Sequence, residues 1–282
     1  DRRFTDAQFF KLYMKITKPD TTFTKGDYTD MQTNLDYEAI VTYLQTQSNR
    51  TDVVTVTFLE GMNLEDFGDT LEESGVCGKE EFLEKCNSTE FDEDYTFLSQ
   101  ITNSDERYYR LEGYLFPDTY QFFENDTVES ILDRFLNNFE NKLTDEMRDD
   151  IAKSGYTTDQ IITLASIIQA EAANTDDMYM ISAILRNRLE NGAEHDIHTL
   201  DCDSTVYYPY KTANDAPEGF VSSYSTYDNS GLPAGPICNP GLDAIMAAIY
   251  PSTSDDCRNA YYFCHDSNGK AYYASTMDDH LM

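Results

Sequence analysis

The stretch TTDQIITLASIIQAEA, residues 157–172, carries clear helix signals and has an acidic residue near its end. Thr157 followed three residues later by Gln160 is the pattern of a capping box, in which each side chain accepts a hydrogen bond from the other residue's backbone N–H. Apolar side chains then recur at helical spacing, which predicts a helix to about Ala173. At about 100° per residue, Glu171 lies at the margin of the apolar face.

The same phasing puts Thr163, Ser166 and Gln169 on the opposite, polar side of the helix. A carboxyl group beside apolar surface is the kind of group that enzymes use as a general acid. Its position alone is equally compatible with a Glu that pairs with an arginine or lies at the surface. Glu171 is therefore a candidate catalytic residue that needs further support.

The charge of the chain limits its partners. Acidic residues outnumber basic ones by 52 to 20 among 282 residues, for a formal net charge of −32. Such a surface repels a phosphate backbone and an anionic membrane surface, so we expect no nucleic-acid partner. No stretch reaches the roughly 18 apolar residues that span a bilayer. The first residue is Asp1 rather than Met, so a leader or anchor could have been cleaved from the chain.

Cysteines and histidines offer few sites for a metal. None of the six cysteines forms a C-x-x-C pair, which disfavours a zinc ribbon, and the acidic, His-containing segment 194–198 has no helical register. We therefore expect no metal. Cys77 with Cys86, and Cys257 with Cys264, are close enough in sequence for disulfides, as suits an extracellular chain, with buried free thiols as the alternative.

Predicted helices, strands and loops alternate along the chain. Residues 1–60 form a small unit with a helical run at 37–44 and a strand at 53–59. The further predicted elements are helices at about 64–75, 128–142, 177–189 and 243–250, and a hairpin of 261–263 with 271–273 around a turn at 266–269. Residues 193–241 are rich in Tyr, Ser, Gly and Pro and predict loops. Within them, 224–241 is a loop stiffened by Pro and Gly, whose Tyr and Asn side chains are either structural or suited to bind sugars.

Four stretches, in order along the chain, resemble the motifs of the YceG-like endolytic murein transglycosylases (the MltG family). They are EGYLFPDTY at 112–120, LASIIQAEA at 164–172, ILRNRL at 184–189 with DSTVYY at 203–208, and YSTY at 224–227 leading through GLPAGPI to NPG at 239–241. The resemblance covers roughly residues 60–282. Four ordered motifs are much more specific than any one of them, and they favour the catalytic interpretation of Glu171.

The resemblance implies an α+β fold in two parts. A small LysM-like α/β module at 1–60 would precede a larger catalytic domain at 61–282, with a helical part and short antiparallel strands. In that family a single-pass membrane anchor, absent from this chain, precedes the module, which implies a location at the cell membrane with the catalytic domain outside the cytoplasm. The implied partner is the glycan strand of peptidoglycan, with cell-wall synthesis proteins as further candidates. No cofactor is implied.

The resemblance also implies cleavage between N-acetylmuramic acid and N-acetylglucosamine without water, which would limit the length of nascent strands. Glu171 would protonate the glycosidic oxygen and then act as base toward the muramyl 6-hydroxyl, which closes a 1,6-anhydro ring. One carboxyl suffices because the nucleophile belongs to the substrate, whereas glycosidases that use water normally need two. The residues implied to bind and orient the glycan are Asp203, Thr205, Tyr224, Thr226, Tyr227 and Asn239.

Two positions depart from the family motifs. Gln169 stands where the family commonly has a second glutamate, and Ser204 stands where it usually has proline, which we interpret as a change in loop stiffness. Two other functions stay open. One is a hydrolase in which Glu112 or Asp203 is a second carboxylate, and the other is a non-enzymatic protein that binds the wall or docks on the synthesis machinery.

Overall fold

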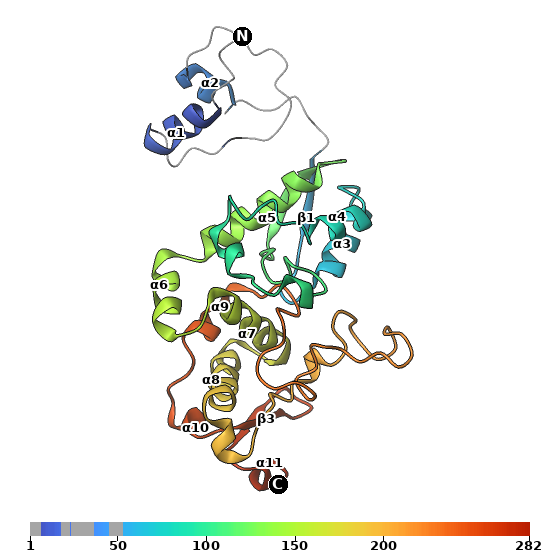
Figure 1. The fold of residues 1–282 in the computed structure, drawn as a ribbon, viewed down its shortest axis with the longest axis vertical. Helices are drawn as coiled ribbons and strands as arrows, with labels where there is room; N and C mark the ends of the chain where they lie inside the picture. The colour runs from blue at the N-terminus through green and yellow to red at the C-terminus, as the bar shows by residue number, and fades with distance from the viewer. Residues whose placement is uncertain (1–6, 18–22, 24–36, 45–52) are drawn as a thin grey trace. The chain divides into compact units, whose positions relative to one another are not determined.

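Helix α7 (Thr158–Glu171) begins at the predicted capping box. Thr157 Oγ1 accepts a hydrogen bond from Gln160 N at 3.1 Å, and Gln160 Oε1 accepts one from Thr157 N at 2.9 Å. This computed structural model describes residues 7–17, 23, 37–44 and 53–282. Within them α7 packs against α8 (Thr175–Asn191), α9 (Leu242–Ile249) and α6 (Asp145–Ser154) (Figure 1). Every residue of α7 from 161 to 168 is buried as a result.

The polar side of α7 is not a solvent-facing one, because Thr163 and Ser166 are buried. The loop around Ile237 covers this side, and Ile237 N donates a hydrogen bond to Ser166 Oγ at 3.0 Å. Both hydroxyls also donate to carbonyls of the preceding turn, which satisfies them inside the helix. Only Gln169 of the three is partly exposed. Short polar residues in a helix therefore do not by themselves mark a solvent face.

The chain divides into two compact units, residues 1–53 and 54–282. The described part of the first contains α1 (Ala7–Thr17) and α2 (Tyr37–Leu44), where Tyr37 packs its ring on Phe10 and Tyr13 at centroid distances of 5.6 and 5.3 Å. The sequence boundary at 60/61 assigns strand β1 (Val53–Thr57) to the N-terminal module, whereas all but its first residue belongs to the larger unit. The LysM-like character of the module stays a prediction.

The larger unit begins with a two-stranded sheet of β1 and β2 (Thr119–Phe123). The end of β1 meets the start of β2, where Thr57 Oγ1 and Thr119 Oγ1 are 2.8 Å apart, so the strands run antiparallel. Around this sheet and in the segments that follow lie helices α3 (Leu64–Glu73), α4 (Lys79–Lys85) and α5 (Val128–Lys142), and short 3₁₀ turns η1 (Thr96–Gln100) and η2 (Ser104–Glu106). The mixture of helices and short antiparallel strands confirms the predicted α+β class.

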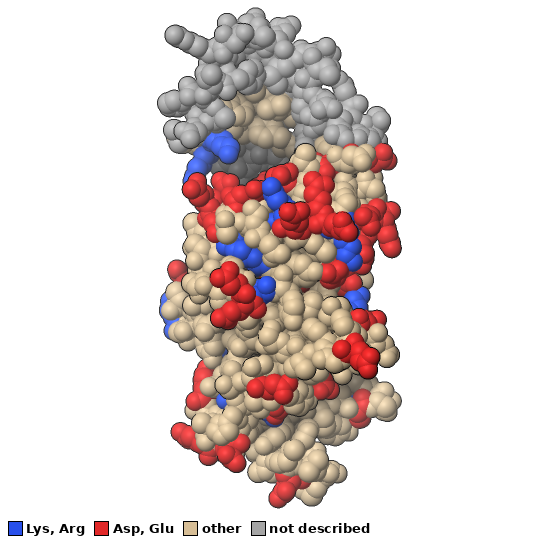
Figure 2. All heavy atoms as spheres, turned by 45° about the vertical axis from the view of Figure 1, so that its right-hand side comes forward, with Lys and Arg blue, Asp and Glu red and all other residues tan. Residues whose placement is uncertain are grey.

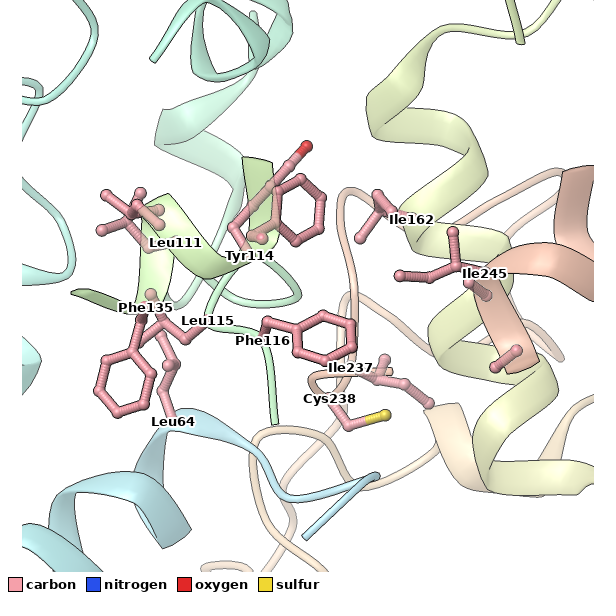
Figure 3. Close-up of a cluster of buried hydrophobic side chains, with 14 of the residues drawn as sticks. Leu64, Leu111, Tyr114, Leu115, Phe116, Phe135, Ile162, Ile237, Cys238 and Ile245 are labelled. Atoms are coloured by element: carbon pink, nitrogen blue, oxygen red, sulfur yellow. The ribbon is translucent and has the colours of Figure 1, made fainter. Parts of the chain in front are cut away.

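One hydrophobic core connects the sheet region to the helices around α7. Figure 3 shows Leu115 and Phe116, from the stretch before β2, between Leu64 and Phe135 on one side and Ile162 of α7 with Ile245 of α9 on the other. All of these side chains are at most 5% exposed. The 112–120 motif thus supplies the apolar link that fixes the sheet region relative to α7.

The C-terminal part carries the predicted hairpin, with β3 (Tyr262–His265) paired antiparallel to β4 (Ala271–Ala274). Before and after it lie η3 (Gly192–His195), η4 (Asp203–Thr205), α10 (Asp255–Arg258) and α11 (Met277–His280). Helix α6 was not among the predicted elements, although Thr144 caps its start and Gly155 ends it at φ 85°. All six cysteines are free, so the expectation of disulfides is wrong.

Candidate active site

Glu171 is the last residue of α7 and is partly exposed. Its Oε1 accepts a hydrogen bond from Ser204 N at 3.1 Å. Its Oε2 has no hydrogen-bond partner within the described ranges. One oxygen is therefore held by the backbone, while the other is available to exchange a proton.

The turn that carries Ser204 is held by two buried threonines. Thr205 Oγ1 donates to Cys202 O at 2.8 Å and accepts from Thr226 N at 3.0 Å, and Thr226 Oγ1 accepts from Cys202 N at 3.0 Å. Thr205 and Thr226 are 0% and 1% exposed. Both were expected to bind glycan directly. In the structure they join η4 to the 224–227 segment, which fixes the donor that holds Glu171, and their contact with glycan stays a prediction.

Asp203 and Tyr227 face solvent beside this turn. The Tyr227 hydroxyl donates to Asp203 Oδ1 at 2.7 Å, and this bond, followed by burial, raises the pKa of Tyr227 to about 12. The structure thus brings both side chains together one residue from Ser204, and their contact with glycan stays a prediction. Tyr224 differs, because it is buried between the rings of Tyr108 and Tyr208 at centroid distances of 5.6 and 4.7 Å. Its side chain therefore has a packing role, and its predicted sugar contact stays a prediction.

Asn239 and Glu112 form a buried polar centre that joins three segments. Asn239 Oδ1 accepts from Gly113 N and Leu115 N at 3.0 and 3.1 Å, and Asn239 Nδ2 donates to Glu112 Oε1 at 3.0 Å. Asn239 is fully buried and has a structural role here, while its expected role in glycan binding stays a prediction. The bond connects the 112–120 motif to the loop that covers α7.

The second oxygen of Glu112 ties this centre to two further segments. Glu112 Oε2 accepts from Leu64 N at 3.1 Å, at the start of α3, and from the Tyr208 hydroxyl at 3.0 Å. The side chain is 1% exposed, and burial raises the pKa of Glu112 to about 8. Such a carboxyl is inaccessible to a polymer, so Glu112 is excluded as a substrate-facing second carboxylate.

Arg188, in the 184–189 motif, positions the chain before Asp203. Arg188 Nη1 donates to Leu200 O at 2.7 Å and to Asp201 Oδ2 at 2.9 Å, and Nε donates to Tyr261 O at 2.6 Å. The planar guanidinium reaches these groups together, as a lysine ammonium does not. It therefore links the loop leading to η4 with the segment before β3.

A cleft of about 410 Å³ opens beside Glu171. Ala170 and Ser204, the chain neighbour and the hydrogen-bond partner of Glu171, both line it, whereas Glu171 itself is not among the lining residues. The remaining walls come from three segments, 59–66, 208–211 and 237–238. Sequence reasoning missed the first two segments, because nothing local marks a residue as facing a cleft. Within the described residues no group of three or more metal-ligating side chains comes together.

Comparison with known proteins gives this arrangement a context. The sequence model of the YceG-like family matches residues 2–282. The chain belongs to the YceG-like family. A crystal structure of a yceG-like protein from Listeria monocytogenes shares its fold, with a TM-score of 0.68 and 27% identity over 98% of this chain and 90% of that one.

Two curated relatives of this YceG-like chain bear the name endolytic murein transglycosylase. The one from Streptococcus pneumoniae strain D39 is 29% identical over 292 residues, which is 96% of this chain but 52% of that protein. The one from Bacillus subtilis is 28% identical over 287 residues, which is 96% of this chain and 74% of that protein. The chain thus spans about half the length of the pneumococcal relative.

Proposed function

We propose that this YceG-like chain is an endolytic murein transglycosylase with Glu171 as its acid and base. The observation that carries the proposal is a single, partly exposed carboxyl whose hydrogen-bond partner Ser204 lines a cleft, with one oxygen held by Ser204 N and the other free of protein partners among the described residues. The names of the curated relatives supply the substrate class and the endolytic character of the reaction.

In the proposed reaction Glu171 donates its proton to the glycosidic oxygen as the bond between C1 of N-acetylmuramic acid and that oxygen breaks. The carboxylate then takes the proton of the muramyl 6-hydroxyl, whose oxygen attacks C1 and closes the 1,6-anhydro ring. The same oxygen of Glu171 serves both transfers, so the fixed oxygen need not move. Cuts of this kind within a strand would limit the length of nascent glycan.

A hydrolase with two carboxylates is the second candidate, and the exposure of Asp203 favours it over a protein without catalytic activity. Asp203 precedes the residue that holds Glu171, and its carboxylate already carries the Tyr227 hydroxyl. A water between two carboxylates is the arrangement that inverting glycosidases use. Mass spectrometry of the cut ends distinguishes the two reactions, since hydrolysis leaves reducing ends and the transglycosylase leaves anhydro ends.

The decisive variant is Glu171→Gln, assayed on purified glycan strands, with Asp203→Asn as the matched comparison. We expect Glu171→Gln to lower the rate of cleavage by about 10²–10⁴-fold, and Asp203→Asn to retain anhydro products. Strand binding should persist in both variants. Unchanged cleavage by Glu171→Gln would reject Glu171 as the catalyst, and reducing ends from the unmodified protein would establish the hydrolase.

We further propose that the chain works outside the cytoplasm at the cell membrane, near wall-synthesis proteins, as the family resemblance implies. In the described ranges, no helix has both the length and the apolar character needed for a membrane crossing. Protease accessibility of the chain in intact protoplasts, compared with lysed ones, tests this location. Protection in intact protoplasts would count against it.

A further inference from the structure

We propose that Lys211 recognises a carboxylate carried by the muramic acid side of the strand, and so gives the cleft its preference for murein over an uncharged N-acetylglucosamine polymer. The inference rests on the proposed function for its substrate class. It concerns a residue that none of the sequence motifs contains. Lys211 lies beyond the end of the 203–208 motif and is the only basic side chain among the described residues that line the cleft.

The electrostatic surroundings favour a basic residue at this position. The chain has a formal net charge of −32, and acidic side chains are spread over the described surface in Figure 2, with only scattered basic groups between them. Murein strands are themselves anionic, since muramic acid carries a lactyl carboxyl that is either free or joined to a peptide with carboxylates of its own. An acidic cleft would repel them. Two acidic residues, Glu60 and Asp66, line this cleft.

Lys211 is held at the cleft and still has donors to offer. Its Nζ lies 2.5 Å from Asp66 Oδ1, while its side chain is 65% exposed and that of Asp66 is 17% exposed. A lysine ammonium has three N–H donors, so this ion pair leaves two for a ligand. Asp66 therefore orients the ammonium and leaves two of its N–H donors for a ligand.

The base of the loop that carries Lys211 is anchored. The Asn63 side chain donates to Pro209 O at 3.2 Å, and the Ser222 hydroxyl donates to Tyr208 O at 2.7 Å. The rings of Tyr210 and Phe220 pack edge to face at 5.0 Å, which joins the two sides of the loop. Lys211 thus lies two residues from an anchored position, which limits how far its ammonium group can move from the cleft.

The test measures binding, with every protein carrying Glu171→Gln so that no strand is cut. Lys211→Gln is compared with Lys211→Arg, which keeps the charge, and with Lys270→Gln, which removes the same charge from an exposed position just before β4. The ligands are amidase-stripped strands, peptide-bearing strands, and both kinds after conversion of their carboxyls to amides.

We expect Lys211→Gln to weaken binding of an unmodified strand about tenfold, which corresponds to about 1.4 kcal/mol, with Arg restoring most of the affinity and Lys270→Gln changing little. Amidated strands should bind the Gln and Lys forms equally. A loss confined to stripped strands assigns the lactyl carboxylate, and a loss on peptide-bearing strands assigns a peptide carboxylate. The inference is overturned if Lys211→Gln binds every unmodified strand as tightly as the protein that keeps Lys211. It is also overturned if Lys270→Gln weakens binding equally, or if Lys211→Gln weakens the binding of amidated strands by the same factor. Failure of the proposed function would appear separately: the protein that retains Glu171 would then leave no anhydro ends on the strands.

Discussion

Replacing Glu112 by Gln should remove a large part of the pH dependence of stability. Burial raises the pKa of Glu112 from the ordinary 4.5 to about 8. Between these two values the folded protein holds a proton that the unfolded chain has lost, so the free energy of unfolding falls as the pH rises. The contribution is complete below pH 4.5 and is lost as the pH passes about 8. Its slope reaches about 1.4 kcal/mol per pH unit, and the whole effect is on the order of 4–5 kcal/mol.

The assay is urea unfolding followed by circular dichroism from about pH 5 to about pH 8.5, which covers most of the window and its upper limit. Glu112→Gln should be less stable than the unmodified protein by about 1–3 kcal/mol at the acid end, because its amide nitrogen would face another donor, Asn239 Nδ2. That difference should shrink or reverse toward the alkaline end. Glu84→Gln, at an exposed position in α4, is the control for lost charge. A difference that stays constant with pH, or an equal change in the control, would refute the assignment of the proton to Glu112.

Two further predictions concern the turn that holds Glu171. Thr205→Val removes a buried hydroxyl that donates to Cys202 O and accepts from Thr226 N. It should therefore lower the free energy of unfolding by about 1–3 kcal/mol and reduce kcat more than it raises KM. Kinetics equal to those of the unmodified protein would contradict the role of the turn. Ser204→Pro introduces the residue of the family motif but deletes the N–H that binds Glu171. We expect this variant to have normal stability and a kcat about 3–30-fold lower. The control Ser204→Ala keeps the N–H and should retain the activity. Unchanged kcat in the proline variant would show that the hydrogen bond does not orient the carboxyl.

The fold was predictable where the signal is local. The capping box at Thr157 and the turn between β3 and β4 both lie where the sequence places them, because caps and turns are made by residues a few positions apart. The burial of Ser166 on the polar side of α7 was not predictable, because it depends on a contact that is not local. The loop that covers Ser166 lies more than 70 residues away in sequence, and helical periodicity carries no information about it.

The candidate site shows the same division. Glu171 could be singled out because its helix and motif are contiguous, and Asp203 and Tyr227 do meet beside it. Lys211 and the 59–63 segment could not be found, since their place in the cleft depends on long-range packing. Ser204 is an intermediate case, because its difference from the motif was visible while the backbone hydrogen bond that gives the difference meaning was not.

The buried motif residues show that a polar residue of a family motif can have a structural role of its own. Glu112 and Asn239 satisfy one another inside the protein, and removal of either leaves buried donors or acceptors without partners. A polar residue in that position is tightly constrained by the fold, whether or not it touches a ligand. An exposed cleft residue such as Lys211 carries no comparable structural constraint, so its type is free to follow the charge of the substrate. In this chain the motifs therefore identify the frame that holds Glu171, and the exposed residues between and beyond them are where differences in substrate preference should be sought.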